Sequence, residues 1–315
     1  MDNEDRIRIG HLSTVYHTAF ILRGSNLLEN ENISAEWTLY PSGPDIVNAM
    51  EKGAIDLGYI GLPPVIIGID RGVQLCCIAG GHIEGTVMIT GGAVKTLPEC
   101  TGMTEFLNQF SGGAIGCPPR GSIHDVIVNK LVSEYGISGV TVRNYPWADF
   151  IPDALLTGEI GAAAGTPALA AAGKRFAGAR IAINPDLLWP FNPSYGIVVK
   201  RDALIHEDLL MRFLKAHEAA SEMIRHNPHA SAMIVAKVAG VIDEDFVMET
   251  YAISPKYCSA LPEEYIISTL KFSETLFSLG YISRAISDKE IFDTSLIDRV
   301  HTAPHHYRSG IKQPQ

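Results

Sequence analysis

The chain has 315 residues, of which 46% are hydrophobic and 19% are charged, and its formal net charge at pH 7 is -10. This composition is that of a folded globular protein with enough material for one large or two medium cores, which argues against extensive disorder. With only 25 Lys and Arg residues, the chain has no basic stripe that would neutralise a run of phosphates, so we expect no nucleic-acid partner.

The chain has five cysteines, and no pair of them has C-x-x-C spacing. This pattern indicates reduced thiols and disfavours a disulfide framework or a zinc ribbon. No window approaches the roughly 20 apolar residues of a membrane span, so we expect no direct membrane insertion. The polar start at residues 1–6 is unlike a signal peptide. As written, the sequence predicts a cytoplasmic location, with an extracytoplasmic one as the alternative if a leader was trimmed.

The first third of the chain alternates strand and helix patterns. The expected strands are residues 7–12, 37–40, 55–60, 73–79 and 86–90. The expected helices are residues 18–28, 43–52 and 64–70. The second of these helices follows Ser42, where Ser-Gly-Pro-Asp has the form of a capping box. Alternating strands and helices predict an α/β domain with a mainly parallel sheet.

The same alternation restarts near residue 114, and Ser122-Ile-His-Asp again has the form of a helix start. The expected strands are residues 114–117, 140–144, 160–164 and 196–200. The expected helices are residues 122–135, 149–156, 209–224, 232–238, 245–250 and 263–279. From about residue 302 the sequence is short and polar, so we expect this end to fray.

Two segments of the chain carry the same pattern in the same order. Residues 49–55 and 154–160 both read Ala-x-x-x-Gly-x-Ile, and a Gly-x-Pro follows each, at 61–63 and at 165–167. Although Ala, Gly and Pro are common enough for a chance match, the preserved order favours a structural duplication. We therefore expect two lobes. Their expected extents are residues 1–88 plus 195–315 for lobe 1 with the C-terminal helices, and 89–194 for lobe 2.

Ligands of parallel α/β lobes bind at the carboxyl ends of strands, where loops lead into helices. Five such loops are expected, at residues 13–16, 41–43, 61–63, 118–122 and 165–167. Each carries Gly, Ser, Thr or Pro, so each can direct free backbone N–H groups and the positive end of a helix dipole to one cleft. For any single loop, plain helix capping explains these residues, but the set predicts an anion.

Arg120 adds a charge to this set, because it lies between a stiff Pro-Pro and a permissive Gly-Ser. Such a guanidinium suits bidentate binding of a carboxylate, sulfonate or phosphonate, and the alternative is a solvated surface arginine. Tyr145, Trp147 and Tyr195 lie in expected loops at the lobe edges. They would supply flat apolar walls to a ligand or serve as plain packing.

At these residues the chain resembles a known family. Ser42-Gly43, residues 49–56, Gly61-Leu62-Pro63 and Gly116-x-x-x-x-Gly-Ser-x-His are similar to successive landmarks of the nitrate/sulfonate/taurine (NitT/TauT) substrate-binding proteins of ABC transporters. The related fold includes thiamine-pyrimidine synthase-like proteins. The resemblance implies a two-lobed periplasmic binding protein type II fold, of the venus flytrap kind. It also implies a small-molecule solute, hinge closure, an ABC permease as partner, and a monomer.

The resemblance also implies that the ligand-binding residues come from the loops described above. The expected set is Ser13, Thr14, Tyr16, Ser42, Gly61, Leu62, Arg120, Ser122, Thr166 and Tyr195. One departure concerns the strand that ends in Gly165-Thr166-Pro167, where family members often carry Trp-Glu-Pro. The usual acidic and aromatic ligands of that branch are therefore missing, although Thr166 still offers a hydroxyl and a backbone N–H.

An enzyme or sensor in the cytoplasm, built on the same fold and acting on a small aromatic or carboxylic acid, is the alternative function. Against it, Cys76-Cys77 alone does not make the cysteine-dense iron motif of thiamine-pyrimidine synthases. Cys117, before a helix start and near His124, is the one candidate nucleophile, with a structural thiol as the competing interpretation. In the tail, His301, His305 and His306 predict at most adventitious metal binding. We therefore expect no catalytic residues, no cofactor and no metal.

Overall fold

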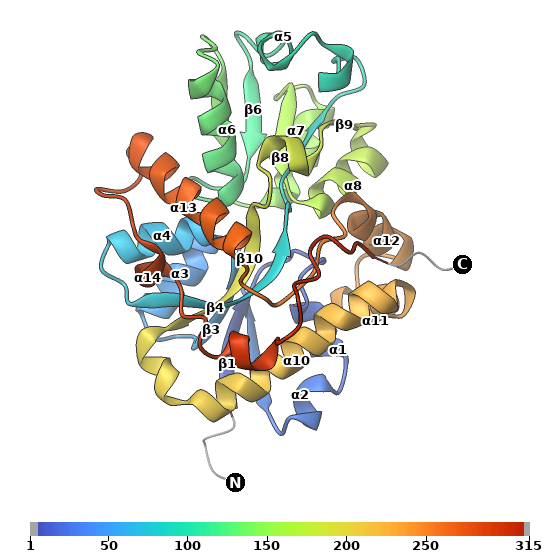
Figure 1. Cartoon of the computed structure of the whole chain (residues 1–315). Coiled ribbons are helices and arrows are strands. Elements are labelled where there is room, and N and C mark those ends of the chain that lie inside the picture. Colours follow the sequence, from blue (N-terminus) through green and yellow to red (C-terminus); the bar gives the residue numbers. More distant parts are fainter. Residues whose placement is uncertain (1–5, 312–315) are drawn as a thin grey trace.

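Two five-stranded sheets form the framework of the protein, which a computed structural model describes over residues 6–311 (Figure 1). The sheet of lobe 1 has the order β2 (Ser34–Leu39), β1 (Arg6–His11), β3 (Leu57–Ile60), β10 (Pro193–Lys200) and β4 (Leu75–Ile83). The sheet of lobe 2 has the order β7 (Thr141–Asn144), β6 (Ala114–Cys117), β8 (Ala162–Gly165), β5 (Val87–Thr90) and β9 (Arg180–Ile183). In Figure 1, lobe 2 lies above lobe 1.

The two sheets have the same internal arrangement. In lobe 1, β1 is parallel to β2 and β3, whereas β10 is antiparallel to β3 and β4. In lobe 2, β6 is parallel to β7 and β8, whereas β5 is antiparallel to β8 and β9. In each sheet, four strands therefore run in one direction, and the strand at the fourth position of the order is antiparallel to them. The predicted pair of similar, mainly parallel α/β lobes is confirmed.

The two antiparallel strands are also the first strands that form after the chain crosses from one lobe to the other. β5 follows β4 of lobe 1, and β10 follows β9 of lobe 2. The predicted domain boundaries, at 88/89 and 194/195, fall inside these two strands. We propose that the residues just before β5 and at the start of β10 are the hinge of the molecule.

Helix starts follow the predicted capping pattern. Helix α3 (Gly43–Glu51) begins after Ser42, whose Oγ accepts a hydrogen bond from the backbone N–H of Asp45 at 3.4 Å. Helix α6 (Ile123–Glu134) begins after Ser122 in the same way, with Oγ 3.3 Å from the N–H of Asp125. Side-chain capping of this kind satisfies donors that the helix itself leaves unpaired. Both predicted S-x-x-D starts are confirmed.

The single helix predicted over residues 18–28 is wrong. The chain instead forms α1 (Ala19–Gly24) and, after a break, α2 (Leu27–Asn30). Ser25 is extended, with φ -128° and ψ 173°, and thus interrupts the helical path. Gly24 at the break is packed so closely that a Cβ atom there would lie 2.5 Å from Ile234. Tertiary packing, which helical spacing does not report, thus ends α1 early.

The remaining helices cover the faces of the two sheets (Figure 1). Those before β10 are α4 (Leu62–Asp70), α5 (Met103–Asn108), α7 (Ile151–Leu156), α8 (Pro167–Ala177) and α9 (Pro185–Leu188). Those after β10 are α10 (Glu207–His226), α11 (Pro228–Ala239), α12 (Glu244–Ile253), α13 (Glu263–Ser278), α14 (Asp288–Ile291) and α15 (Ile297–Val300). All nine residues of β4 are buried, as expected for a strand of a sheet with both faces covered. The C-terminal helices predicted from apolar spacing are confirmed.

Some C-terminal helices contact both lobes. Helix α13 packs against α4 of lobe 1 and α6 of lobe 2, and α12 packs against α8 of lobe 2. Helix α11 contacts α1 and α12. The C-terminal helices thus flank the junction between the lobes, and α11 and α12 form one side of it (Figure 1).

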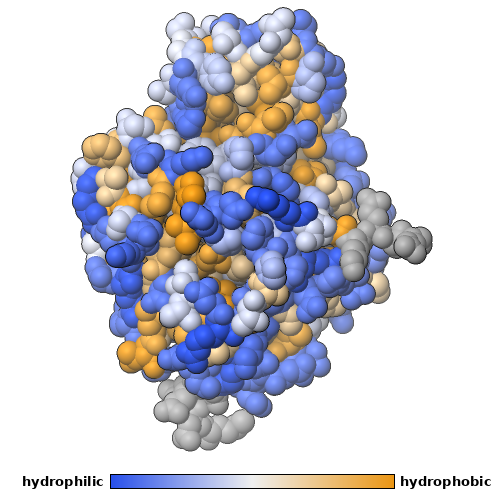
Figure 2. Space-filling view, in the orientation of Figure 1, coloured by the Kyte–Doolittle hydropathy of each residue, from blue (hydrophilic) through white to orange (hydrophobic). Residues whose placement is uncertain are grey.

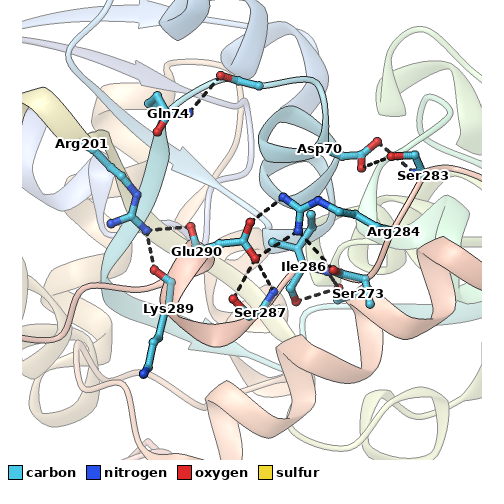
Figure 3. Close-up of polar contacts among 12 residues, drawn as sticks. Asp70, Gln74, Arg201, Ser273, Ser283, Arg284, Ile286, Ser287, Lys289 and Glu290 are labelled. Atoms are coloured by element: carbon cyan, nitrogen blue, oxygen red, sulfur yellow. Dashed lines mark hydrogen bonds and ion pairs between the residues drawn. The ribbon is translucent and has the colours of Figure 1, made fainter.

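Polar contacts tie the segment after α13 to lobe 1 (Figure 3). The backbone N–H and the hydroxyl of Ser283 both donate to Asp70, at 3.0 and 2.8 Å. The guanidinium of Arg201 donates to two backbone carbonyls, those of Lys289 and Glu290, at 2.8 Å each. In the interior, Ser273 Oγ accepts from the N–H of Ile286 at 2.6 Å and donates to its carbonyl at 3.0 Å.

Ser273→Ala is expected to lower the free energy of unfolding by about 1–3 kcal/mol. Ser273 is buried, so its loss leaves the N–H and the carbonyl of Ile286 without their hydrogen-bond partner. Ser278→Ala, at the exposed end of the same helix, is the matched control, with an expected change below about 0.5 kcal/mol. Urea unfolding of both variants measures the difference, and equal stabilities would contradict the packing described here.

The tail predicted to fray from about residue 302 is held in place over the described residues. Tyr307 is fully buried, and its hydroxyl donates to the carbonyls of Cys258 at 2.7 Å and Ala260 at 3.0 Å. A Cβ atom on Gly80 of β4 would overlap this hydroxyl, so the bare glycine backbone makes room for the ring. For residues 302–311 the prediction of fraying is wrong, because one buried aromatic anchors an otherwise polar segment, and residues 312–315 lie outside the described part of the chain.

One face of the molecule is shown in Figure 2, where it is mostly hydrophilic and narrows between the upper and lower parts. Hydrophobic residues show on this face in separate patches. Within residues 6–311, no helix combines the length and the apolar composition that crossing a membrane requires.

Candidate functional site in the cleft between the lobes

A cavity of about 410 Å³ lies between the lobes, beside α11 and α12. Lobe 1 lines it with His11, Ser13, Thr14, Val15, Phe20, Arg23 and Leu39. Lobe 2 lines it with Ala148, Asp149, Pro152, Thr166, Ala168, Leu169 and Ala172. The flanking helices contribute an apolar wall of Val238, Ala239, Val241, Ile242 and Phe246. A volume of this size suits a small organic molecule.

The wall from lobe 1 begins where β1 ends. His11 Nδ1 lies 2.8 Å from the carbonyl oxygen of Leu12, and its Nε2 lies 3.2 Å from Nη1 of Arg23. Burial lowers the pKa of His11 to about 4, and the positive charge of Arg23 acts in the same direction. A neutral ring that donates through Nδ1 to Leu12 can accept from Arg23 through Nε2. His11 thus orients the guanidinium.

Arg23 is an exposed cation on this wall. Within the part of the chain that the structure describes, its guanidinium forms no ion pair with an aspartate or glutamate. Its guanidinium carbon also lies 5.8 Å from the ring centre of Phe20. Because five N–H donors project from a planar group, such an arginine can bind an oxyanion by two parallel hydrogen bonds.

The wall from lobe 2 contains the start of α8. Thr166 Oγ1 accepts a hydrogen bond from the N–H of Leu169 at 3.1 Å, so its hydroxyl proton is available to a ligand. The helix has eleven residues, and its N-terminus carries a partial positive charge. Asp149, which lines the same wall, is exposed. The cavity therefore has hydroxyl donors on both sides, with one cation and one carboxylate on opposite lobes.

Three of the ten predicted ligand residues line this cavity, namely Ser13, Thr14 and Thr166. Tyr16 and Tyr195 are buried and do not line it. Tyr16 shares a 2.8 Å hydrogen bond with Ser194 Oγ, and the hydroxyl of Tyr195 accepts from the backbone N–H of Thr18 at 3.2 Å.

Four further predicted residues lie at the starts of helices α3, α4 and α6. Ser42 caps α3 and Ser122 caps α6, while Gly61 and Leu62 begin α4. A Cβ atom on Gly61 would lie 3.7 Å from Ile123 of α6 and 3.2 Å from the carbonyl oxygen of Ser194. The starts of α4 and α6, from opposite lobes, thus lie side by side.

Arg120 lies in a different place from the other predicted residues. Its guanidinium carbon is 4.8 Å from the ring centre of Tyr281, a cation–π contact. The two residues line a separate groove of about 280 Å³ with Ile67 and Arg71. The structure therefore does not bring Arg120 to the cavity that Ser13, Thr14 and Thr166 share.

Sequence reasoning missed His11, Arg23 and Asp149. Arg23 falls in the middle of the helix predicted over 18–28, where it resembles any solvated surface charge. His11 ends a strand that reads as buried core, and its only signal was its place at the carboxyl end of β1. Asp149 resembled an ordinary first-turn acid of a helix. Only the approach of the two lobes gives these residues a common position.

Cys117 does not have the surroundings of a nucleophile. Burial raises the pKa of its thiol, and the nearby carboxylate of Asp125 acts in the same direction, while Asn144 donates to Sγ at 3.2 Å. His124 instead pairs with Thr86, with Nδ1 and Oγ1 3.0 Å apart, and burial lowers its pKa to about 3. A protonated thiol and an uncharged histidine bonded elsewhere supply no activated pair.

Comparison with known proteins agrees with this architecture. The sequence profile of the NMT1-like family matches residues 2–240. No curated protein matches the chain in sequence. A ligand binding component of an ABC-type import system from Staphylococcus aureus, solved with zinc bound, is 17% identical and has a TM-score of 0.79. That alignment covers 95% of this chain and 100% of the other.

Two further solved structures have the same fold. The alkanesulfonate-binding protein SsuA from Xanthomonas axonopodis pv. citri, bound to MOPS, is 17% identical, with a TM-score of 0.77 over 92% of this chain and 98% of that one. The periplasmic nitrate-binding protein NrtA from Synechocystis PCC 6803 is 11% identical, with a TM-score of 0.76 over 98% and 91%. The chain belongs to the NMT1-like family, and its predicted resemblance to the NitT/TauT substrate-binding proteins is confirmed in family and in fold.

Proposed function

We propose that the protein is the solute-binding component of an ABC importer and captures a small anionic or polar organic molecule between its lobes. The observation that carries this proposal is Arg23, a cation without a carboxylate partner among residues 6–311, placed at a cavity with Ser13 and Thr166. Solved proteins of the same fold include binders of alkanesulfonate and nitrate, both small oxyanions. A permease would read the closed form, and we expect the protein to act as a monomer.

The proposed mode of binding divides the solute between the two lobes. Arg23 and Ser13 bind the anionic head from lobe 1, and Thr166 donates to it from the start of α8. Asp149 accepts a hydrogen bond from the other end of the solute. The apolar wall around Ile242 and Phe246 favours a solute with some carbon, such as an alkanesulfonate, over a bare ion.

Closure of the lobes about the hinge before β5 and β10 completes the proposed mechanism. A solute that binds one lobe stabilises the closed form only if it also contacts the other, and the cavity offers donors on both. The remaining predicted residues have a supporting part in this proposal. Tyr16, Ser42, Gly61, Leu62, Ser122 and Tyr195 shape the facing helix starts and the floor, and Arg120 is held at the separate groove.

Arg23→Ala is expected to weaken binding of a small anion by about 1.5–3 kcal/mol, which is roughly 10- to 150-fold. The physical reason is the loss of a charge-assisted hydrogen bond in a partly enclosed site. Arg120→Ala is the matched control, because it removes the same charge from the other groove and should leave the affinity unchanged. Calorimetric titration with taurine, methanesulfonate and nitrate makes the comparison. A larger loss of anion affinity in Arg120→Ala than in Arg23→Ala would contradict this assignment and indicate that the anion binds in the groove beside Arg120.

Native mass spectrometry of freshly purified protein tests the proposed function itself. A solute-binding protein should retain a small molecule at a ratio of one to one and release it unchanged on unfolding. Incubation with more of that molecule should give no product. Conversion of the molecule would instead establish the enzyme alternative, and a retained nucleotide or aromatic cofactor would contradict the proposal.

A further inference from the structure

Three side chains from distant parts of the chain converge at the edge of lobe 1, away from the interlobe cavity. Cys258 lies in the loop after α12, and His301 and His306 lie in the C-terminal segment. Cys258 Sγ is 3.3 Å from His301 Nε2 and 3.7 Å from His306 Nδ1, and the two ring nitrogens are 3.2 Å apart. One thiol and two imidazole nitrogens therefore form a triangle of potential ligand atoms.

The size of the triangle matches a tetrahedral metal site. Zinc binds thiolate sulfur at about 2.3 Å and imidazole nitrogen at about 2.0–2.1 Å. At tetrahedral angles, these bond lengths place two nitrogens roughly 3.3 Å apart and a nitrogen and a sulfur roughly 3.6 Å apart. The three separations of the trio are 3.2, 3.3 and 3.7 Å. An ion would thus need little movement of the side chains.

The surroundings of the trio suit a bound cation. Cys258 is fully buried, and the side chain of His301 is 3% exposed. The backbone N–H of His306 points to Cys258 Sγ at 3.3 Å, as an N–H that stabilises a thiolate would. Glu218 Oε1 lies 3.8 Å from His301 Nε2, and its other oxygen is held by Ser259 at 2.5 Å. The same Oε1 accepts from the guanidinium of Arg225 at 2.9 Å, so this carboxylate fixes the position of the triangle while its charge is balanced by an arginine.

We propose that Cys258, His301 and His306 bind one zinc ion, or another divalent cation that prefers sulfur and imidazole ligands, with a water molecule at the fourth position. Such an ion joins the loop after α12 to the C-terminal segment, two parts of the chain 43 and 48 residues apart. Because such an ion binds the folded chain, it also stabilises the position of the tail, whose Tyr307 packs against Gly80 of β4. None of the three residues lines the interlobe cavity, so this proposal is independent of the proposed function.

Cobalt(II) titration of the full-length protein, stripped of metal with a chelator, tests the proposal. We expect one equivalent of cobalt to bind with an absorption band from thiolate to cobalt charge transfer, and one equivalent of zinc to abolish the band. Cys258→Ser should remove the band. Loss of a residue that only supports a metal ligand already weakens metal binding about 10- to 100-fold, so His306→Gln, which removes a proposed ligand, should weaken cobalt binding by at least as much. His305→Gln, one residue away, is the matched control and should bind as the wild type does.

Thermal unfolding with and without zinc tests the proposal even where a variant is less stable, because each variant is compared with itself. Zinc should raise the melting temperature of the wild type and of His305→Gln but not of His306→Gln, a conservative change that keeps a polar side chain at the same place. A wild type that binds no cobalt, a cobalt complex without the thiolate band, or a Cys258→Ser variant with unchanged affinity would each overturn the assignment. A copper(I) preference in competition with zinc would overturn the choice of a divalent ion.

Discussion

Lowering the pH from about 7 to 5.5 is expected to destabilise the protein by several kcal/mol. His82, His124 and His217 are buried, and burial lowers their pKa values to about 3, 3 and 4. Their contacts are with uncharged groups, such as the carbonyl of Ser254 at 2.6 Å from His82 Nε2 and that of Gly80 at 2.8 Å from His217 Nε2. The folded state therefore holds all three rings uncharged.

The direction of the effect follows from proton uptake. In the unfolded chain a histidine has a pKa of about 6.5, so below this pH the unfolded state binds protons that the folded state does not. The stability is then complete above about pH 6.5 and falls as the pH decreases. Each such histidine contributes about 1.4 kcal/mol per pH unit, or about 4 kcal/mol per unit for these three, and His11 and His17, whose pKa values burial also lowers, add to the slope. Because the free energy of unfolding of a folded protein is typically about 5–15 kcal/mol, a loss of this size over one or two pH units is a large fraction of the total.

Urea unfolding at intervals between pH 7.5 and 5 measures this dependence. Protonation of carboxylates with lowered pKa values, such as Glu290 at about 2, also destabilises the folded protein. This effect begins only when the pH falls below about 4.5, the pKa of these groups in the unfolded chain. The chosen window thus isolates the histidines. His82→Gln should flatten the slope by about 1.4 kcal/mol per pH unit. His226→Gln, on the exposed end of α10, should not change it. A free energy of unfolding that does not change between pH 7.5 and 5 would contradict the burial of these histidines in the uncharged form.

Tyr195→Ala is expected to lower the free energy of unfolding by about 3–5 kcal/mol. The ring is completely buried at the start of β10, with its centre 4.1 Å from that of His17 and 5.7 Å from that of Tyr59. A Cβ atom on Gly81 of β4 would overlap the same ring, which shows how closely it packs on the neighbouring strand. No small rearrangement fills the space that alanine would leave.

Tyr195→Phe separates the ring from its hydroxyl. This variant keeps the packing and loses only the hydrogen bonds to the N–H and the Oγ1 of Thr18, both 3.2 Å long, so we expect a loss of about 1 kcal/mol. Its anion affinity should equal that of the wild type, since the residue is buried and does not line the cavity. Chemical denaturation and calorimetry together make the test. If Tyr195→Ala keeps the stability of the wild type but loses its affinity for the anion, Tyr195 contacts the ligand, which would contradict this account.

Much of the fold is predictable because its signals are local. The caps at Ser42 and Ser122 and the Gly-x-Pro turns report short-range hydrogen bonding and backbone geometry, which the sequence carries directly. The repeated pattern at 49–55 and 154–160 predicts two similar lobes, and the two sheets do share one strand order and one arrangement of directions. Ser13, Thr14 and Thr166 were predictable for the same reason, as residues at the carboxyl ends of strands.

The rest depends on contacts between distant segments. Helix α1 ends at Gly24 because α11 packs there, and the C-terminal segment is ordered because Tyr307 fits over Gly80. Arg23 acquires its position at the cavity only because α1 packs against α11 and faces lobe 2 across the cavity. Arg120, although it precedes a predicted helix start, turns to Tyr281 from the segment after α13. No spacing rule within a lobe reports such neighbours.

A crystal structure of the protein grown with the anion that binds most tightly in calorimetry tests the central claim most directly. We predict electron density for that anion in the cavity between the lobes, with its charged head within hydrogen-bond distance of Arg23, Ser13 and Thr166. Density for the anion beside Arg120 and Tyr281, or an empty interlobe cavity in a crystal that contains the bound anion elsewhere, would contradict the account.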